Sequence, residues 1–176
     1  MSKGVILYQS KYGATKKYVD WLIEETGYDC IETKKVKVND LENYDVIILG
    51  GGVYASGIAG LGFLKKNIGY LENKKVAVFA VGASPYDEKA IKQIRDLHFK
   101  DALSKIDLFY CRGMWDEDKM KFMDRTLCKM LQKAVAKQNP ENYEPWQKAL
   151  MCSIGQKCDW TDKIYLEPLI KFIKEK

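Results

Sequence analysis

Short, continuous runs of apolar residues alternate with amphipathic segments over the first two thirds of the chain. The runs are rich in β-branched residues, which is typical of strands buried on both faces of a sheet. The predicted strands are 5–8, 29–38, 45–50, 75–82 and 106–111. Between them, apolar positions recur at helical spacing. The predicted helices are 15–27, 60–71 and 87–103. The pattern therefore predicts strands and helices in alternation.

This order of elements indicates the fold class. Continuous apolar strands separated by amphipathic helices favour a parallel sheet covered on both faces, and right-handed crossovers leave few ways to connect it. We expect the strand 45–50 to end at the three glycines 50–52. Residues 46–64 carry no charge, but their six glycines favour a buried strand and a loop over a membrane span. Without an internal repeat or a linker, the chain is expected to be one α/β domain over residues 1–176.

The regular alternation stops after Gly113. Residues 116–138 predict a helix with one apolar face, rich in methionine and leucine, and a basic face opposite. The basic side chains are Lys121, Arg125, Lys129, Lys133 and Lys137. Residues 143–158 show no clear pattern, and residues 160–176 predict a closing helix. We interpret about 115–155 as an insertion in the domain.

Composition narrows the possible functions. Apolar residues make up 47% of the 176 positions and charged residues 30%, which is the balance of a globular protein. The early charge at Lys11 argues against a signal peptide, so we expect a cytoplasmic protein with reduced cysteines. One histidine and five scattered cysteines argue against a zinc site and a Ser-His-Asp triad. Nothing in the pattern supports nucleic-acid binding.

The segment Ser10-Lys11-Tyr12-Gly13-Ala14-Thr15 joins the first predicted strand to the first predicted helix. An open parallel sheet binds ligands at the carboxyl ends of its strands, and a phosphate there meets free backbone N–H groups at the positive end of a helix dipole. Hydroxyl side chains add donors, and Gly13 lets the backbone approach closely. The segment predicts a phosphate site, with an ordinary turn capped by Thr15 as the alternative.

Two more loops rich in small residues follow the third and fourth predicted strands. The first contains Gly52, Val53, Tyr54, Ala55 and Ser56, and the second contains Gly82, Ala83, Ser84 and Tyr86. Small residues let backbone amides reach the edge of a flat heterocycle, and a tyrosine can stack on its face. Plain turn chemistry would explain either loop alone. Three such loops at successive strand ends favour a site for a ring system.

Together these segments resemble the flavodoxin-like proteins that bind FMN. The resemblance covers about residues 3–113. It implies a doubly wound, five-stranded parallel sheet in the order 2-1-3-4-5, with the amphipathic helical segment inserted after the fifth strand begins. It also implies that Ser10 to Thr15 hold the FMN phosphate. Gly52 to Ser56, and Gly82 to Ser84 with Tyr86, would border the isoalloxazine ring.

Within this superfamily, the rest of the chain is most similar to menaquinone-dependent protoporphyrinogen oxidases. The segments that carry the similarity are Cys111-Arg112-Gly113-Met114, the Lys- and Met-rich stretch 119–123, and Cys158-Asp159-Trp160. The similarity implies an FMN-dependent oxidoreductase that dehydrogenates protoporphyrinogen IX in haem biosynthesis with a quinone acceptor. An electron-transfer flavodoxin and a partner-binding module that has lost FMN are the alternatives. No side chain is a candidate general acid or base.

The basic helix bears on the choice of partner. Flavodoxins that carry single electrons are typically acidic, whereas this chain has a net charge of +5, with its surplus between residues 119 and 138. We expect Lys121, Arg125, Lys129 and Lys133 to attract an anionic substrate or the inner face of an anionic membrane. In the alternative, these side chains form a solvated face while the methionines pack on the sheet.

Overall fold

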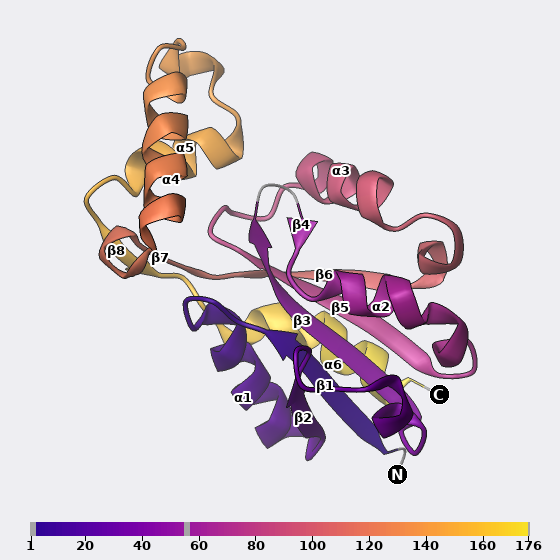
Figure 1. Cartoon of the computed structure of the whole chain (residues 1–176). Helices are drawn as coiled ribbons and strands as arrows, with labels where there is room; N and C mark the ends of the chain where they lie inside the picture. The colour runs from indigo at the N-terminus through magenta and orange to yellow at the C-terminus, as the bar shows by residue number, and fades with distance from the viewer. Residues whose placement is uncertain (1–2, 55–56, 176) are drawn as a thin grey trace.

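The computed structural model describes residues 3–54 and 57–175. Its centre is a parallel sheet in the order β2-β1-β3-β5-β6 (Figure 1). The strands are β1 (Gly4–Gln9), β2 (Asp29–Glu32), β3 (Val46–Tyr54), β5 (Lys75–Gly82) and β6 (Asp107–Arg112). A two-residue strand, β4 (Gly57–Ile58), pairs antiparallel with the end of β3. Counted without β4, the order is the predicted 2-1-3-4-5, and the predicted fold class is confirmed.

Successive residues of a strand point to opposite faces of the sheet, so a continuous apolar strand makes both faces apolar. Helices cover both of these faces. The helices are α1 (Ala14–Thr26), α2 (Leu61–Asn67), α3 (Glu88–His98) and α6 (Glu167–Lys174). On one face, Leu7, Leu49 and Val78 pack with residues of α2 and α3. On the other, Ile6 and Ile48 pack with residues of α1 and α6. All five strand residues are completely buried, so the apolar runs of the sequence form the core.

Two strands differ in length from the sequence prediction. β3 runs through the three glycines instead of ending at them, since it pairs with β1 on one side and β5 on the other. Gly50 is required inside the strand because a Cβ there would lie 2.2 Å from the Phe79 ring. β2 is shorter than the predicted strand 29–38, because the Lys35 amide turns back to the Glu32 carbonyl at 2.8 Å.

Four predicted helices are also shorter than expected. The helix predicted at 60–71 is α2, which a 3-10 turn at Ile68–Leu71 follows, and the helix predicted at 160–176 is α6, which a 3-10 turn at Lys163–Leu166 precedes. The helix predicted at 87–103 ends at His98, where Phe99 leaves the helix and buries its ring in the core. The helix predicted at 116–138 is α4 (Phe122–Val135). It begins late because β7 (Met114–Asp116) and a 3-10 turn precede it, and carbonyls of that turn accept hydrogen bonds from the Arg125 guanidinium.

Residues 114–159 form an arm that projects from one end of the sheet (Figure 1). It contains α4 and α5 (Pro145–Cys152), and at its base β7 pairs antiparallel with β8 (Lys157–Asp159). α5 and β8 occupy the segment for which the sequence pattern indicates no element. The fifth main strand, β6, is complete before the arm starts, so the insertion follows that strand and does not interrupt it. Among the described helices, none is both long and apolar enough to cross a bilayer.

Candidate functional site

The carboxyl ends of β1, β3 and β5 meet at one edge of the sheet, beside the base of the arm. Their loops border a cavity of about 620 Å³, a volume typical of small-molecule sites. The predicted residues that line this main cavity are Ser10, Tyr12, Ala14, Thr15, Gly52, Val53, Tyr54, Gly82, Ala83 and Ser84. The structure therefore brings the three predicted loops together at one site.

Three other predicted site residues are described but are not part of the cavity lining. Lys11 and Gly13 belong to the first loop but are not part of the cavity lining. Tyr86 is 61% exposed outside the lining, and its ring meets the edge of Tyr110 with the ring centroids 6.2 Å apart. Residues 55 and 56, the predicted Ala55 and Ser56, lie outside the described residues.

The loop between β1 and α1 is shaped for a close backbone approach. Gly13 is the N-cap of α1 with a φ of 98°, a left-handed conformation that favours glycine. The Ser10 hydroxyl accepts hydrogen bonds from the amides of Gly13 and Lys16, at 3.2 and 3.4 Å. Thr15 is buried inside the first turn, so the alternative in which it caps the helix is wrong. That turn carries no acidic side chain, which leaves its positive end open to an anion.

Two glycines make room for tyrosine side chains in the other loops. A Cβ on Gly52 would lie 2.8 Å from the Tyr54 ring, and a Cβ on Gly82 would lie 2.6 Å from the Tyr110 hydroxyl. That hydroxyl donates a hydrogen bond to the Ser84 carbonyl at 2.6 Å and so holds the third loop in place. The open helix end fits a phosphate, and the cavity of about 620 Å³ between the loops has room for a flat ring, which are the two parts of FMN.

An aromatic and cationic cluster lies beside the loop between β1 and α1. The Lys11 ammonium is 5.5 Å from the ring centroids of both Tyr12 and Tyr54. The two rings meet edge to face, with their centroids 6.5 Å apart. Burial raises the pKa of Tyr54 even though Lys11 is near, so its phenol is neutral at physiological pH. The Tyr54 ring is therefore an uncharged stacking surface.

Asp124, on α4, joins the arm to the loop between β1 and α1. Its carboxylate accepts a hydrogen bond from the Tyr12 hydroxyl and forms an ion pair with Lys11. The Lys121 amide donates to the same hydroxyl at 3.1 Å. Lys11, followed by Tyr12, holds the pKa of Asp124 below its ordinary value of 3.8, so the carboxylate is charged at neutral pH. The sequence analysis missed this residue, whose only signal was its being the single acid among six basic residues in 119–138.

The arm supplies the far wall of the main cavity, which the sequence analysis also missed. This wall includes Trp115, Leu127, Cys128, Leu131, Trp146 and Leu150, and Trp160 lines the cavity directly after the arm. Burial raises the pKa of the Cys128 thiol, which therefore stays uncharged. The Arg112 guanidinium lies 4.3 Å from the ring centroid of Trp160 and donates to the Ala83 carbonyl at 3.3 Å. Arg112 thus connects the wall to the third loop.

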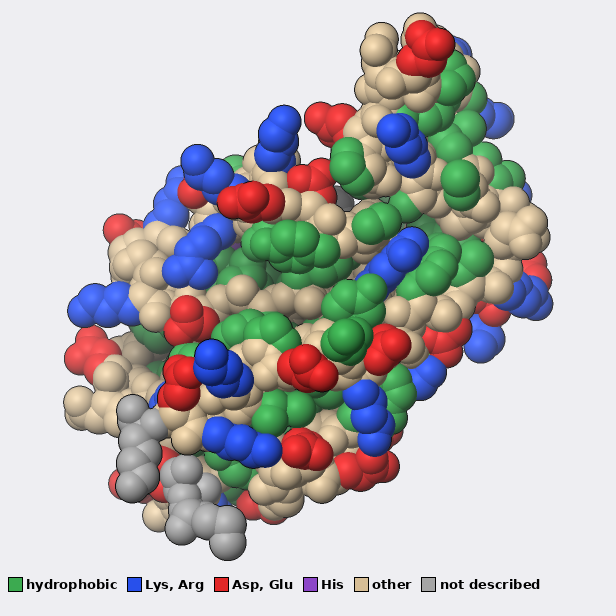
Figure 2. Space-filling model, turned by 180° about the vertical axis from the view of Figure 1, so that it is seen from behind, with side chains coloured by type: hydrophobic (Ala, Val, Ile, Leu, Met, Phe, Trp, Pro, Cys, Tyr) green, Lys and Arg blue, Asp and Glu red, His purple; other side chains and the backbone are tan. Residues whose placement is uncertain are grey.

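The apolar stripe of α4 does not pack on the sheet, contrary to one of the two interpretations of this helix. Met130 is 62% exposed, and Figure 2 shows hydrophobic side chains along the projecting arm. Lys129 and Lys133 are exposed too and, at about 100° per residue, lie on the opposite side of the helix from the cavity-lining Leu131. Arg125 differs from them, because its guanidinium hydrogen-bonds within the arm.

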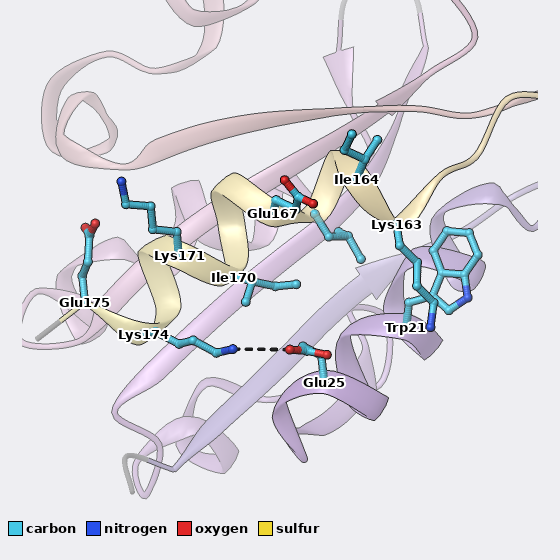
Figure 3. A pocket seen from close by; sticks show the side chains of 10 residues that line it. Trp21, Glu25, Lys163, Ile164, Glu167, Ile170, Lys171, Lys174 and Glu175 are labelled. Atoms are coloured by element: carbon cyan, nitrogen blue, oxygen red, sulfur yellow. Dashed lines mark hydrogen bonds and ion pairs between the residues drawn. The ribbon is translucent and has the colours of Figure 1, made fainter.

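A second hollow, of about 610 Å³, lies between α1 and α6. Figure 3 shows its charged rim, where Lys174 and Glu25 form an ion pair at 3.3 Å. Three lysines and three glutamates line it, together with Trp21 and aliphatic side chains. None of its lining residues belongs to the loops at the carboxyl ends of the strands. This hollow is therefore separate from the predicted cofactor site.

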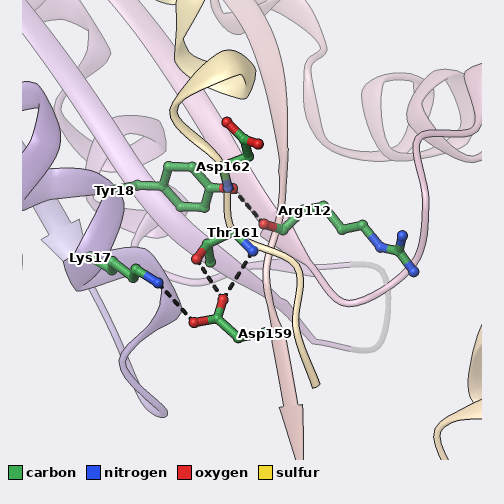
Figure 4. Close-up of polar contacts among 6 residues, drawn as sticks. All are labelled: Lys17, Tyr18, Arg112, Asp159, Thr161 and Asp162. Carbon is green, nitrogen blue, oxygen red and sulfur yellow. Dashed lines mark hydrogen bonds and ion pairs between the residues drawn. The ribbon is translucent and has the colours of Figure 1, made fainter. Parts of the chain in front are cut away.

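Polar contacts hold the base of the arm to α1 (Figure 4). Lys17 donates to the Asp159 carboxylate at 2.8 Å. The buried Tyr18 hydroxyl donates to the Arg112 carbonyl at 2.5 Å and accepts from the Asp162 amide at 3.2 Å. Because α1 begins at the loop that follows β1, these contacts set the position of the arm relative to that loop.

The sequence matches the family model described as "Flavodoxin domain" over residues 5–142. Because this match covers most of the chain, the protein belongs to the flavodoxin domain family. Flavodoxins bind FMN at the switch point of the sheet, so the FMN prediction is confirmed at the level of the family. The match does not distinguish a protoporphyrinogen oxidase type within it. Comparison with the curated proteins gives no match.

Several solved structures share part of the architecture. A flavoprotein from Lactobacillus acidophilus, solved in complex with FMN, is 20% identical, with a TM-score of 0.47 over 64% of this chain and 93% of that one. The two-electron reduced flavodoxin of Megasphaera elsdenii is 20% identical, with a TM-score of 0.43 over 61% of this chain and 82% of its own. The Trp repressor binding protein of Bacillus subtilis is 11% identical, with a TM-score of 0.45 over 63% and 85%. At these levels the family assignment rests on the sequence match.

Proposed function

We propose that this protein binds FMN at the edge of the sheet where its three loops meet. Family membership, the open helix end and the cavity between the loops support the proposal. Residues 10–15 would hold the phosphate, and residues 52–56 and 82–84 with Tyr86 would border the ring. When bound, FMN supplies the hydride or electron transfer, and the protein supplies position and electrostatics.

The chain's own residues bind, orient and shield the ligand in this proposal. The first turn of α1 offers backbone N–H groups to the phosphate, and Ser10 holds the loop in shape. Tyr54 offers a neutral ring for stacking, while Tyr110 fixes the third loop through the Ser84 carbonyl. The arm excludes water from the far side of the site, because its wall is mostly apolar.

We further propose that the protein is an FMN-dependent oxidoreductase acting on a small molecule, of the protoporphyrinogen oxidase type. One observation carries this proposal: the main cavity does not stop at the three loops but extends to the apolar wall of the arm. A carrier that exchanges electrons only with protein partners has no need of an apolar cavity beside its cofactor. In the proposed reaction, each pair of hydrogen atoms removed from protoporphyrinogen IX would reduce one quinone to its quinol, and FMN held by the three loops would supply the electron transfer.

The test is anaerobic incubation of the FMN-loaded protein with protoporphyrinogen IX and menadione. Porphyrin fluorescence is expected only when protein, FMN and quinone are all present, and the cofactor-free protein is the matched control. If the holoprotein retains its flavin absorbance but forms no porphyrin beyond the control, the enzymatic proposal is wrong and the cofactor proposal stands. If no flavin is retained after desalting, both are wrong.

An electron-transfer flavodoxin is the second candidate, favoured by the exposed apolar side chains and lysines of the arm, which offer a docking face for a redox protein. Anaerobic titration with dithionite separates the two candidates. A carrier is expected to take up its electrons in two resolved one-electron steps. Reduction in a single two-electron step would contradict the carrier role and favour the enzyme.

We propose a cytoplasmic location with peripheral contact at the inner membrane face. Lys129 and Lys133 point away from the main cavity, so they are placed for an external anionic surface and not for a bound substrate. Each lysine near such a surface contributes about 1 kcal/mol. The protein is expected to sediment with phosphatidylglycerol vesicles but not with phosphatidylcholine vesicles. Equal sedimentation of the wild type and the Lys129→Glu, Lys133→Glu variant would contradict this role.

A further inference from the structure

Arg112, the last residue of β6, differs from the other two arginines of the chain. The guanidinium groups of Arg95 and Arg125 donate from their Nη atoms to backbone carbonyls and so fasten neighbouring segments. Arg112 donates only from Nε, to the Ala83 carbonyl at 3.3 Å. Within residues 3–54 and 57–175, neither of its Nη atoms has a hydrogen-bond or ion-pair partner. Both Nη groups are therefore available to a ligand.

The Arg112 guanidinium is held in one orientation next to the main cavity. It lies 4.3 Å from the ring centroid of Trp160, and the Ala83 carbonyl fixes its Nε. Trp160 and Ala83 both line the cavity and Arg112 does not, so the guanidinium lies at the rim. A guanidinium stacked on an indole keeps its in-plane N–H groups for other partners. Such a planar fork matches the two oxygens of a carboxylate.

The carboxylates near this rim already have other partners. In the cavity lining, Asp87 accepts hydrogen bonds from two amides at the start of α3, and Asp124 pairs with a lysine. Asp159 pairs with Lys17, and Figure 4 shows the Arg112 side chain extending away from this ion pair. Arg112 is also partly buried, so water solvates its charge incompletely. An anion from a ligand would complete the contacts of this guanidinium.

The cavity beyond the guanidinium is apolar on the side of the arm. Trp160 is followed there by the arm residues Leu127, Leu131, Trp146 and Leu150. A concave wall of indole rings and aliphatic side chains is typical of a site for a flat apolar molecule. A ligand that used both features would place an apolar ring against this wall and an anionic group at the rim.

We propose that Arg112 binds the carboxylate of a flat, apolar ligand whose ring lies in the main cavity against the arm. This deepens the proposed function and rests on it in one respect: the ligand would be the substrate that is dehydrogenated next to FMN. Arg112 would then determine specificity by holding one carboxylate of protoporphyrinogen IX at the rim, so that the ring and not the charge enters the apolar space.

The test uses two probes with one ring system, anionic 2-naphthoate and neutral 2-naphthamide, titrated by calorimetry into the FMN-loaded protein. Naphthoate is expected to bind at least about tenfold more tightly, which is the effect of a charge-assisted hydrogen bond. Raising the sodium chloride concentration about tenfold should weaken naphthoate binding and leave naphthamide binding unchanged, because salt screens the ion pair at the partly exposed rim. This comparison needs no variant and so does not depend on the folding of one.

Three variants assign the effect to the guanidinium. Arg112→Gln removes the charge and should lower naphthoate affinity about tenfold, with no effect on naphthamide. Arg112→Lys keeps the charge without the planar fork, so its affinity should lie between those of the wild type and Arg112→Gln. Lys129→Gln is the matched control, because it removes one positive charge on the exposed side of α4 away from the cavity. It should bind both probes like the wild type.

Four results would overturn the proposal. They are naphthoate that does not bind, naphthoate that binds no better than naphthamide, unchanged naphthoate affinity in Arg112→Gln, and an equal loss in Lys129→Gln. In the third case, weaker FMN binding by Arg112→Gln would assign the guanidinium to the cofactor instead.

Failure of the proposed function would give a different result. Arg112 belongs to β6 and not to the three loops, so the same titrations remain decisive in a preparation that retains no flavin. Naphthoate binding that falls in Arg112→Gln would then support the carboxylate site with the cofactor proposal refuted. The same response in a flavin-loaded protein that forms no porphyrin would support the site and refute only the proposed substrate.

Discussion

Replacing Gly13 by alanine is expected to lower the stability of the protein and to weaken FMN binding. Gly13 is the N-cap of α1 with a φ of 98°, and no atom lies within 4 Å of a Cβ built on it. The effect is therefore purely one of backbone conformation. A residue with a side chain destabilises the folded state by about 1–2 kcal/mol when its backbone is left-handed. Alanine also reduces the conformational entropy of the unfolded chain, which stabilises the protein by about 0.4–1 kcal/mol. The net loss is roughly 1 kcal/mol.

Gly62 provides a matched control. It lies in α2, is exposed like Gly13, and a Cβ built on it also meets no atom within 4 Å, but its φ is not left-handed. Gly62→Ala is expected to stabilise the protein by about 0.5–1 kcal/mol, because glycine is a poor helix former. The same chemical change at the two positions should therefore shift Tm in opposite directions, each by about 2–4 °C for a chain of this length.

Thermal unfolding of the cofactor-free variants measures the stability difference, and quenching of FMN fluorescence on binding measures the affinity. Equal Tm values for the two variants would refute the argument that Gly13 is required for its left-handed backbone. If Gly13→Ala lowers Tm but binds FMN as tightly as Gly62→Ala does, the loop does not hold the phosphate.

Three further predictions follow from the same geometry. Thr15→Ala removes a hydroxyl donor and should weaken FMN binding by about 1–3 kcal/mol, with unchanged affinity meaning that the loop is misassigned. Tyr18→Phe leaves the Arg112 carbonyl and the Asp162 amide without their shared partner, and should lower the free energy of unfolding in urea by about 1–3 kcal/mol. The pKa of Asp124 is lower folded than unfolded, so its contribution to stability is present at neutral pH and is lost as pH falls below its ordinary 3.8. The protection of the α4 amides against hydrogen exchange, relative to their intrinsic rates, should fall over that acid range in the wild type but not in Asp124→Asn. Identical profiles for the two proteins would contradict the contact.

Local pattern was sufficient to predict the sheet and the places of its three loops. A strand buried on both faces needs a continuous apolar run, and such runs mark β1, β3, β5 and β6 without any long-range information. The carboxyl ends of parallel strands meet at one edge of the sheet, so the sequence alone predicts that the three loops lie together. Pattern failed at Gly50, which looks like the end of a strand but lies inside one, because a neighbouring strand's Phe79 ring occupies the space of a side chain.

The arm was decided by tertiary contacts alone. The amphipathic pattern of α4 is equally compatible with packing on the sheet and with exposure, and only the pairing of Met114 with Asp159, 45 positions away, directs the helix away from the core. The same placement brings Asp124 to the loop between β1 and α1, and Trp115 to the cavity wall. Periodicity reports which residues share a face of one element. It carries no information on which distant element packs against that face. The arm side of the cavity is formed by such packing, so the sequence pattern could not predict it.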